Sequence, residues 1–312
     1  MMLARVADSL YWIGRYVERA EHISRLSDVM LTATLDQNDA AVTVAQVALA
    51  SIGGADDQPG HYEAVHSLVF ERDNLGSVVT SLARARENAR QVRDQITTET
   101  WERLNLLYLR VTDPNAEDHF NGGSSAFLHG IIADLHLFKG AVDATMSHGE
   151  GWRFQVLGVH LERAQLIARL LEVCFGEAAE ARLMSDHRTQ MSVLRMACAL
   201  EPYLRIYTAE IQPRRMLEFL LFDEDFPRSI RFATSRIEEQ LTSLARRDQA
   251  FEGAEPERLA ARLSARLKFA DMDEETMGAG GILGVVVAEC SRIHHAIYET
   301  FVAYPLEERL PA

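Results

Sequence analysis

Glutamate and arginine recur together in one pattern, Gly-x-x-x-Glu-Arg-Ala-x-x-Ile-x-Arg-Leu, which the sequence contains twice. In a helix, residues three, four or seven positions apart share a face, so several of these side chains would lie together. A carboxylate can act as a general acid or base, and a guanidinium can hold an anion through two parallel hydrogen bonds. The candidate catalytic residues are Glu18 and Glu162, and the candidate ligand-binding residues are Arg19, Arg25, Arg163, Arg169, His22 and His160.

The same residues also have a purely structural interpretation. A buried network of glutamates and arginines can set the register between two helices, and such networks often specify geometry more than they add stability. Gly14 and Gly158 lie four residues before the two glutamates, where a missing side chain lets another helix approach closely. Mutually paired side chains without a cavity would favour the structural interpretation. A solvent-reachable pocket with unpaired arginines would favour the catalytic one.

Nothing in the sequence predicts a metal or a cofactor. Glu63 and His66 have the Glu-x-x-His spacing of di-iron bundles, but such a site needs a second pair and two more glutamates. The glycine-rich segment 278–284 follows no hydrophobic strand and departs from the dinucleotide-binding pattern. The three cysteines include no Cys-x-x-Cys pair, and their odd number argues against a disulfide framework.

The composition excludes several classes of protein. The chain has 312 residues with a net charge of −14, which disfavours nucleic acid and anionic membranes as partners. No apolar run reaches the roughly 18–20 residues needed to cross a bilayer. Charge appears too early at the N-terminus for a secretory leader, so we expect a cytoplasmic protein.

Apolar residues recur every three or four positions almost throughout, which predicts an all-α protein without a sheet. The scarcity of glycine (18) and proline (8) agrees with a helical fold. We expect helices over residues 3–35, 38–53, 61–71, 75–111, 124–147, 152–175, 185–208, 213–222, 228–250, 255–271 and 282–302.

The chain also resembles itself. Residues 11–29 and 155–173 are identical at eight of 19 positions, and residues 68–73 match 220–225 in the same order. Two ordered matches predict duplication of a whole helical unit. We therefore expect a first helical repeat over 1–147 and a second over 148–312, arranged as two sequence-related bundles about a pseudo-two-fold axis within one compact unit.

Four long segments resemble the alpha-E domain family, which consists of α-helical proteins with a recurring Glu-Arg motif. The resemblance runs from Leu3 to about Phe232, with one departure: the second copy reads Gly158-Val159-His160, where the family usually has Gly-Arg followed by an aromatic residue. The segments are LARVADSLYWIGRYVERAEHISRL, ARENARQVRDQITTETWERLN, EGWRFQVLGVHLERA and EFLLFDEDFPRSIRF.

The resemblance implies a context rather than a reaction. Family members accompany a circularly permuted ATP-grasp protein, often with a transglutaminase-like peptidase, and ATP-grasp enzymes form amide bonds through acyl phosphates. Two hypotheses follow. The chain is a helical partner that docks the ligase and presents or shields its peptide substrate, or it is an enzyme with a Glu/Arg pocket between the repeats that acts on a peptide or amino-acid derivative. A scaffold that only forms a homodimer is a third.

Overall fold

The computed structural model describes residues 2–35, 39–53, 60–176, 184–207, 210–246, 254–270 and 281–303. Within these ranges there are helices and no strands, so the prediction of an all-α protein is confirmed. The helices are α1 (Ala4–Leu35), α2 (Asp39–Ser51), α3 (His61–Phe70), α4 (Val78–Gln91), α5 (Thr98–Val111), α6 (Ala116–Gly122), α7 (Ser124–Thr145), α8 (Glu150–Phe175), α9 (His187–Met196), α10 (Leu200–Tyr207), α11 (Pro213–Phe222), α12 (Ile230–Ala245), α13 (Glu255–Lys268) and α15 (Ile282–Ile297), which continues into the π-helical turn Tyr298–Val302.

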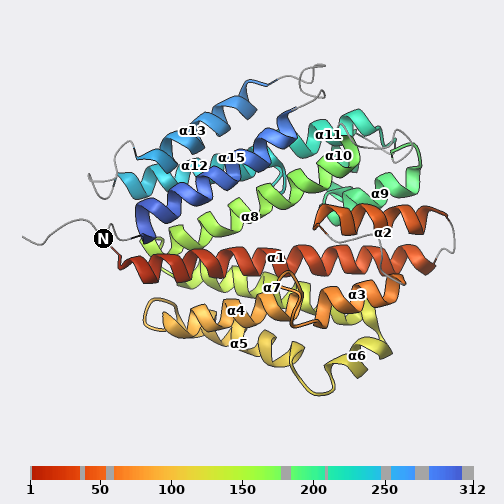
Figure 1. Ribbon diagram of the computed structural model, residues 1–312, viewed down its shortest axis with the longest axis horizontal. Coiled ribbons are helices and arrows are strands. Elements are labelled where there is room, and N and C mark those ends of the chain that lie inside the picture. Colours follow the sequence, from red (N-terminus) through yellow and green to blue (C-terminus); the bar gives the residue numbers. More distant parts are fainter. Residues whose placement is uncertain are drawn as a thin grey trace, which may run out of the picture.

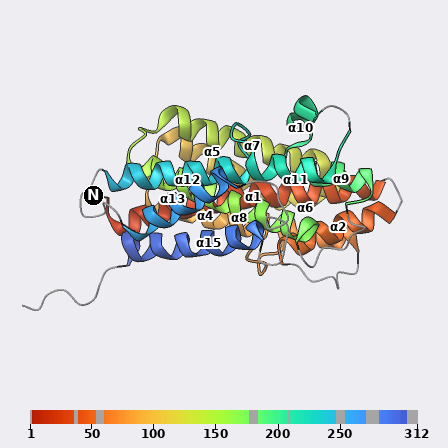
Figure 2. The ribbon, with the colours of Figure 1, turned by 90° about the horizontal axis from the view of Figure 1, so that it is seen from above.

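The two longest helices, α1 and α8, lie side by side in the middle of the molecule (Figure 1). Helices α3, α4 and α7 pack against α1 on one side, with α5 beyond them, while α12 and α15 pack against α8 on the other, with α13 beyond them. Helices α2 and α9 pack together at one end, and α10 projects there from the bundle (Figure 2). Both copies of the Glu-Arg pattern are therefore on the central helix pair.

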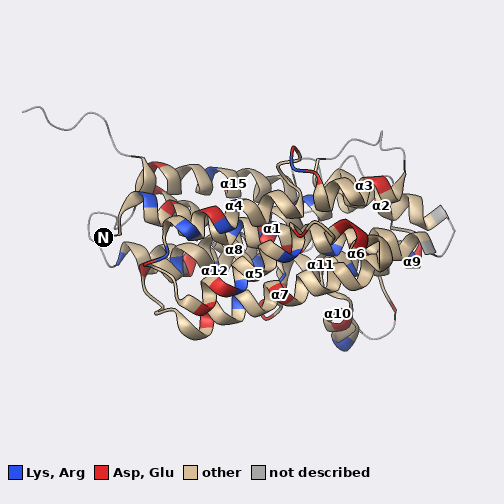
Figure 3. Ribbon diagram, turned by 90° about the horizontal axis from the view of Figure 1, so that it is seen from below, with Lys and Arg blue, Asp and Glu red and all other residues tan. Residues whose placement is uncertain are grey.

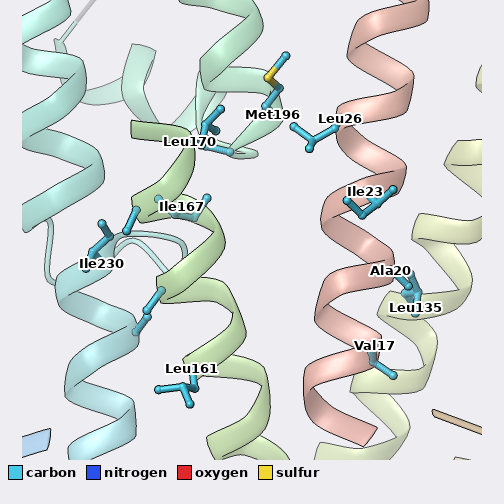
Figure 4. Close-up of a cluster of buried hydrophobic side chains, with 14 of the residues drawn as sticks. Val17, Ala20, Ile23, Leu26, Leu135, Leu161, Ile167, Leu170, Met196 and Ile230 are labelled. Atoms are coloured by element: carbon cyan, nitrogen blue, oxygen red, sulfur yellow. The ribbon is translucent and has the colours of Figure 1, made fainter. Parts of the chain in front are cut away.

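Apolar side chains from both central helices form one continuous core with the surrounding layers. In Figure 4, Val17 and Ala20 of α1 lie on the side toward Leu135 of α7, Leu161 of α8 lies on the side toward the helix of Ile230, and Leu26 of α1 extends toward Met196 of α9. Each fully buried aliphatic side chain contributes about 1.5–3 kcal/mol through removal of apolar surface from water. This burial fixes the helix pair and leaves little freedom to the polar residues between them.

Two expected helices are wrong in extent, because each is in fact a pair. The helix expected over 75–111 ends at Gln91, and α5 starts after Thr97, whose hydroxyl accepts a hydrogen bond from the backbone N–H of Thr100. Such a local hydroxyl bond competes with continued helix. The short helix α6 follows at 116–122, where none was expected.

The helix expected over 185–208 breaks at Cys198, which has a φ of 54°. The N–H of Cys198 donates to Arg195 O and that of Ala199 donates to Leu194 O, the pattern of a Schellman helix end. A helix end of this kind normally has glycine in the left-handed position. Here that residue is a cysteine, so the sequence carries no sign that the helix ends. The expected cap at Asn38 and most of the expected loop at 53–60 lie outside the described residues.

The central helices cross at their two glycines. A Cβ on Gly14 would overlap the carbonyl oxygen of Gln155, and a Cβ on Gly158 would overlap that of Tyr11. Each glycine therefore lies against the backbone three residues before the other. Because backbone atoms cannot rotate away as a side chain can, this close approach requires glycine on both helices.

We predict that Gly14→Ala and Gly158→Ala each lower the free energy of unfolding by at least about 2 kcal/mol, since the helices must separate to admit a methyl group. Gly140→Ala is the matched control, because Gly140 lies inside α7 with open space around its Cβ position. That change should stabilise the protein by about 0.5–1 kcal/mol. Urea unfolding of the three variants measures the effect, and a neutral Gly158→Ala would contradict the close crossing.

Candidate functional site

The Glu-Arg pairs of the two copies bind each other across the α1–α8 interface. Arg163 donates from Nε and Nη2 to the two oxygens of Glu18, both at 2.8 Å. Arg19 donates from Nε to Oε1 of Glu162 at 2.6 Å. Both glutamates are almost fully buried, with exposed fractions of 1% and 3%. The candidate catalytic residues are therefore brought together, and each carboxylate is held by the arginine of the opposite copy.

Arg15 adds a second cation to Glu162. Its Nε donates to Oε2 of that carboxylate at 2.6 Å, and its Nη2 donates to Oε1 of Gln165 at 2.7 Å. Its guanidinium also lies over the Trp12 ring, 5.2 Å from the ring centroid. The arginine after the first glycine, which has no counterpart in the second copy, thus completes the pairing of the second glutamate.

The candidate residues chosen from the sequence did not include Arg15, and they also missed Glu21, Lys139 and Arg228. Glu21 is fully buried and lies one helical turn beyond Glu18. Arg228, just before α12, donates hydrogen bonds to Glu18 and to Glu21, and Lys139 of α7 does the same. A signal for Glu21 existed in its i,i+4 spacing to Arg25. Arg228 and Lys139 come from distant segments, so no local spacing could have identified them.

The other candidate ligand-binding residues are placed differently. Arg25 donates from Nε and Nη2 to Oε1 of Glu21, at 2.9 and 2.7 Å, at one edge of the network. Arg169, its equivalent in the second copy, is exposed and outside the network. His22 and His160 are buried, and Nε2 of the first and Nδ1 of the second have no hydrogen-bond partner among the described residues.

The charge states in the network are fixed by burial and by the neighbouring cations. Burial alone would raise the pKa of Glu162, but Arg15 and Arg19 hold it below its ordinary value. Burial would also raise the pKa of Glu18, but the charges of Arg163, Lys139 and Arg228 outweigh burial and hold this pKa well below its usual range. Burial, with a smaller effect of Arg228, lowers the pKa of His22 to about 4. At neutral pH the carboxylates are ionised and His22 is neutral.

Neither Glu18 nor Glu162 lines the cavity between α1, α2, α7 and α9 or a smaller one beside α3, both on the described part of the chain. The larger one, of about 720 Å³, reaches the network only at Arg25 and at His136 of α7. Glu63 and His66 line the smaller one, but no group of three metal-binding side chains occurs in the described part of the chain. Figure 3 shows the charged positions distributed along the bundle.

These features define the class of protein: a helical bundle whose two central helices are joined by reciprocal Glu–Arg pairs. Residues 2–302 match the Alpha-E family, described as a predicted alpha-helical domain with a conserved ER motif. The chain belongs to this family, as its motifs indicated. Among the Glu-Arg dipeptides of this chain, Glu18-Arg19 and Glu162-Arg163 are the two that lie in the repeated pattern.

Uncharacterised proteins of Mycobacterium bovis and of Mycobacterium tuberculosis are similar to this chain, at 25% identity over 94% of its length. The match covers 35% of each relative, so the chain spans about a third of their length. No solved structure matches the chain significantly. Among the described helices, none combines the length and the apolar character needed to cross a membrane.

We predict that Glu162→Gln lowers the free energy of unfolding by about 3–5 kcal/mol, because it leaves the buried Arg15 without its counter-charge. Glu239→Gln, in the exposed pair with Arg236, is the matched control and should change stability by less than about 0.5 kcal/mol. Thermal and urea unfolding measure both. If Glu162→Gln left stability intact while abolishing an activity of the system, that result would contradict the interpretation of Glu162 as a purely structural residue.

A second prediction concerns pH. The unfolded chain protonates His22 near pH 6.5, whereas the folded protein resists protonation down to about 4. The unfolded state therefore binds more protons in this window, and stability falls as the pH drops through it, by up to about 1.4 kcal/mol per unit. His22→Leu, which installs the residue found at position 166 in the second copy, should flatten this slope.

Urea midpoints between pH 7.5 and 4.5 measure the slope, with His295→Gln as a control at an exposed histidine. An unchanged slope in His22→Leu would show that His22 is already charged or solvated in the folded state.

Proposed function

We propose that this chain is a helical partner in an ATP-grasp-dependent amide-ligation system, one that makes, tags or modifies peptides. A circularly permuted ATP-grasp protein forms the amide bond, a transglutaminase-like peptidase acts in the same system, and this chain docks the ligase. This context is what the resemblance to the alpha-E family implies, and the chain belongs to that family. Because such a ligase consumes ATP, the cytoplasm is the expected compartment.

The observation that carries the non-catalytic role is the closed state of the Glu-Arg network. Both oxygens of Glu18 and of Glu162 accept hydrogen bonds from cationic side chains. A general acid needs a proton near neutral pH, whereas the pKa values of both carboxyls are lowered by their neighbours. A general base needs access to substrate, and both residues are buried. The motif is suited to holding helices together.

The length of the relatives supports a stable association. Some two-thirds of each mycobacterial protein lies outside the matched part. A second unit fused to the helical one in those chains would be the covalent counterpart of the complex that we propose for this protein.

We also propose that the two halves, 1–147 and 148–312, are duplicated repeats about a pseudo-two-fold axis. Three reciprocal features support this: the crossing glycines, the exchanged Glu–Arg pairs, and the matching caps on α4 and α12. In those caps, Ser77 accepts from the N–H of Thr80 and Ser229 from that of Phe232. Both pairs are separated by 152 residues.

The test is co-purification with the circularly permuted ATP-grasp protein of the same genome, by size exclusion with light scattering. We expect a stable complex at micromolar concentration, and faster ATP turnover on candidate amino acids and peptides when both proteins are present. The isolated chain, of 35.0 kDa, provides the reference mass and reports a homodimer at twice that value.

Glu239→Gln, which changes only an exposed ion pair, serves as a folded control that should still form the complex. Absence of a complex at micromolar concentration, with both proteins folded, would contradict the partner role and favour the enzyme hypothesis, with its Glu/Arg pocket.

A further inference from the structure

The cavity of about 720 Å³ lies at the end of the bundle where α1, α2, α7 and α9 meet. Each of the four helices contributes residues spaced three or four apart, so each presents one face to it. The volume is within the range of sites that bind small molecules. The lining residues are Arg25, Asp28, Val29, Thr32 and Ala33 of α1, Ala40, Ala41 and Val44 of α2, His129, Ile132, Ala133 and His136 of α7, and Arg188, Met191, Ser192 and Arg195 of α9, with Cys198 and Glu201.

The wall of the cavity offers hydrogen-bond donors for an anion. Arg25 uses Nε and Nη2 on Glu21, and its Nη1 donates to no described residue. Arg195 is exposed and forms no ion pair within the described part of the chain. By contrast, the carboxylate of Asp28 already accepts hydrogen bonds from Ser125 and from the His129 ring.

The network behind this wall carries an excess of positive charge. Within the described residues, its three carboxylates, Glu18, Glu21 and Glu162, pair with six permanent cations. The chain as a whole has a net charge of −14, so this local excess is unlike the rest of the molecule. Glu21 alone contacts four basic side chains: Arg25, Lys139, Arg228 and the ring of His136. The resulting field favours an anion in the cavity.

We propose that this cavity binds a small dicarboxylate, with Arg195 and Nη1 of Arg25 holding its carboxylates and the apolar side chains of α1, α2 and α7 lining its carbon chain. A planar guanidinium matches a carboxylate through two parallel hydrogen bonds. Phosphate can form the same paired hydrogen bonds with a guanidinium, but inorganic phosphate has no carbon chain to contact apolar lining residues such as Val29, Val44 and Ile132.

Cys198 provides a probe in the same cavity. The other two cysteines of the chain, Cys174 and Cys290, are buried, and burial raises the pKa of each thiol to about 12. A chromogenic disulfide reagent should therefore modify one thiol quickly, and a ligand in the cavity should slow that reaction.

The experiment measures protection of Cys198 in the intact chain by succinate, glutarate, acetate and inorganic phosphate, with calorimetry as a direct measure of binding. Glutarate or succinate should slow the labelling at millimolar concentration or below, and acetate should need at least tenfold more. Arg195→Gln should weaken dicarboxylate binding at least tenfold without loss of thermal stability, because the side chain is exposed. Arg169→Gln, at the equivalent of Arg25 outside the cavity, should bind as the unmodified chain does.

Protection by phosphate at lower concentration than by any dicarboxylate would overturn the assignment of the ligand. Absence of binding and of protection by all four anions at 10 mM, roughly, would overturn the site itself. Equal binding of dicarboxylates by Arg195→Gln and by the unmodified chain would show that Arg195 takes no part in the site. The assay needs no partner protein, so its outcome is independent of complex formation with the ligase.

Discussion

The fold depends on burying three carboxylates around its central helix pair: Glu18 and Glu162 between α1 and α8, and Glu21 against α7 and the segment before α12. Removing an ionised carboxylate from water is costly, by several kcal/mol, unless cations and hydrogen bonds replace the lost hydration. Here the glycines let the backbones of α1 and α8 touch, and this contact brings each glutamate within reach of the opposite arginine. Further positive charge comes from outside the α1–α8 pair. Lys139 and Arg228 supply it, and their hydrogen bonds connect α7 and the start of α12 to the same buried carboxylates.

The helical class and much of the central pair were predictable from the sequence, because amphipathic periodicity is a local property. Both copies of the motif carry glycine, glutamate and arginine at fixed spacings, and those spacings allowed a paired interface to be foreseen. The ends of helices were less predictable. Cys198 occupies a left-handed position that usually signals itself through glycine, so the break between α9 and α10 was invisible.

The site could be predicted only in part, for a related reason. Glu18, Glu162, Arg19 and Arg163 follow from the repeated pattern, whereas Lys139 and Arg228 join them across 121 and 210 residues. Tertiary packing alone selects such partners. Arg169 illustrates the opposite error, since it has the same place in the pattern as Arg25 but faces solvent. Equivalent positions in two copies share a helix face, but what packs against that face can differ.

The differences between the copies account for the cavity wall. Arg15 bonds to Glu162 and Gln165, and the equivalents of those two residues are Glu18 and Glu21. Val159 stands where a second such arginine would be, and Arg228 instead donates to both Glu18 and Glu21.

Gln165 of the second copy is neutral, whereas Glu21, its equivalent in the first copy, carries a buried charge. A buried carboxylate requires cations nearby, whereas a buried amide does not. Arg25, Lys139 and Arg228 supply them to Glu21, and the His136 ring also contacts it. Two of these, Arg25 and His136, also line the cavity. One Glu-for-Gln difference between the copies thus explains why basic side chains gather on the α1 side of the interface, whereas Arg169 has no such role on α8.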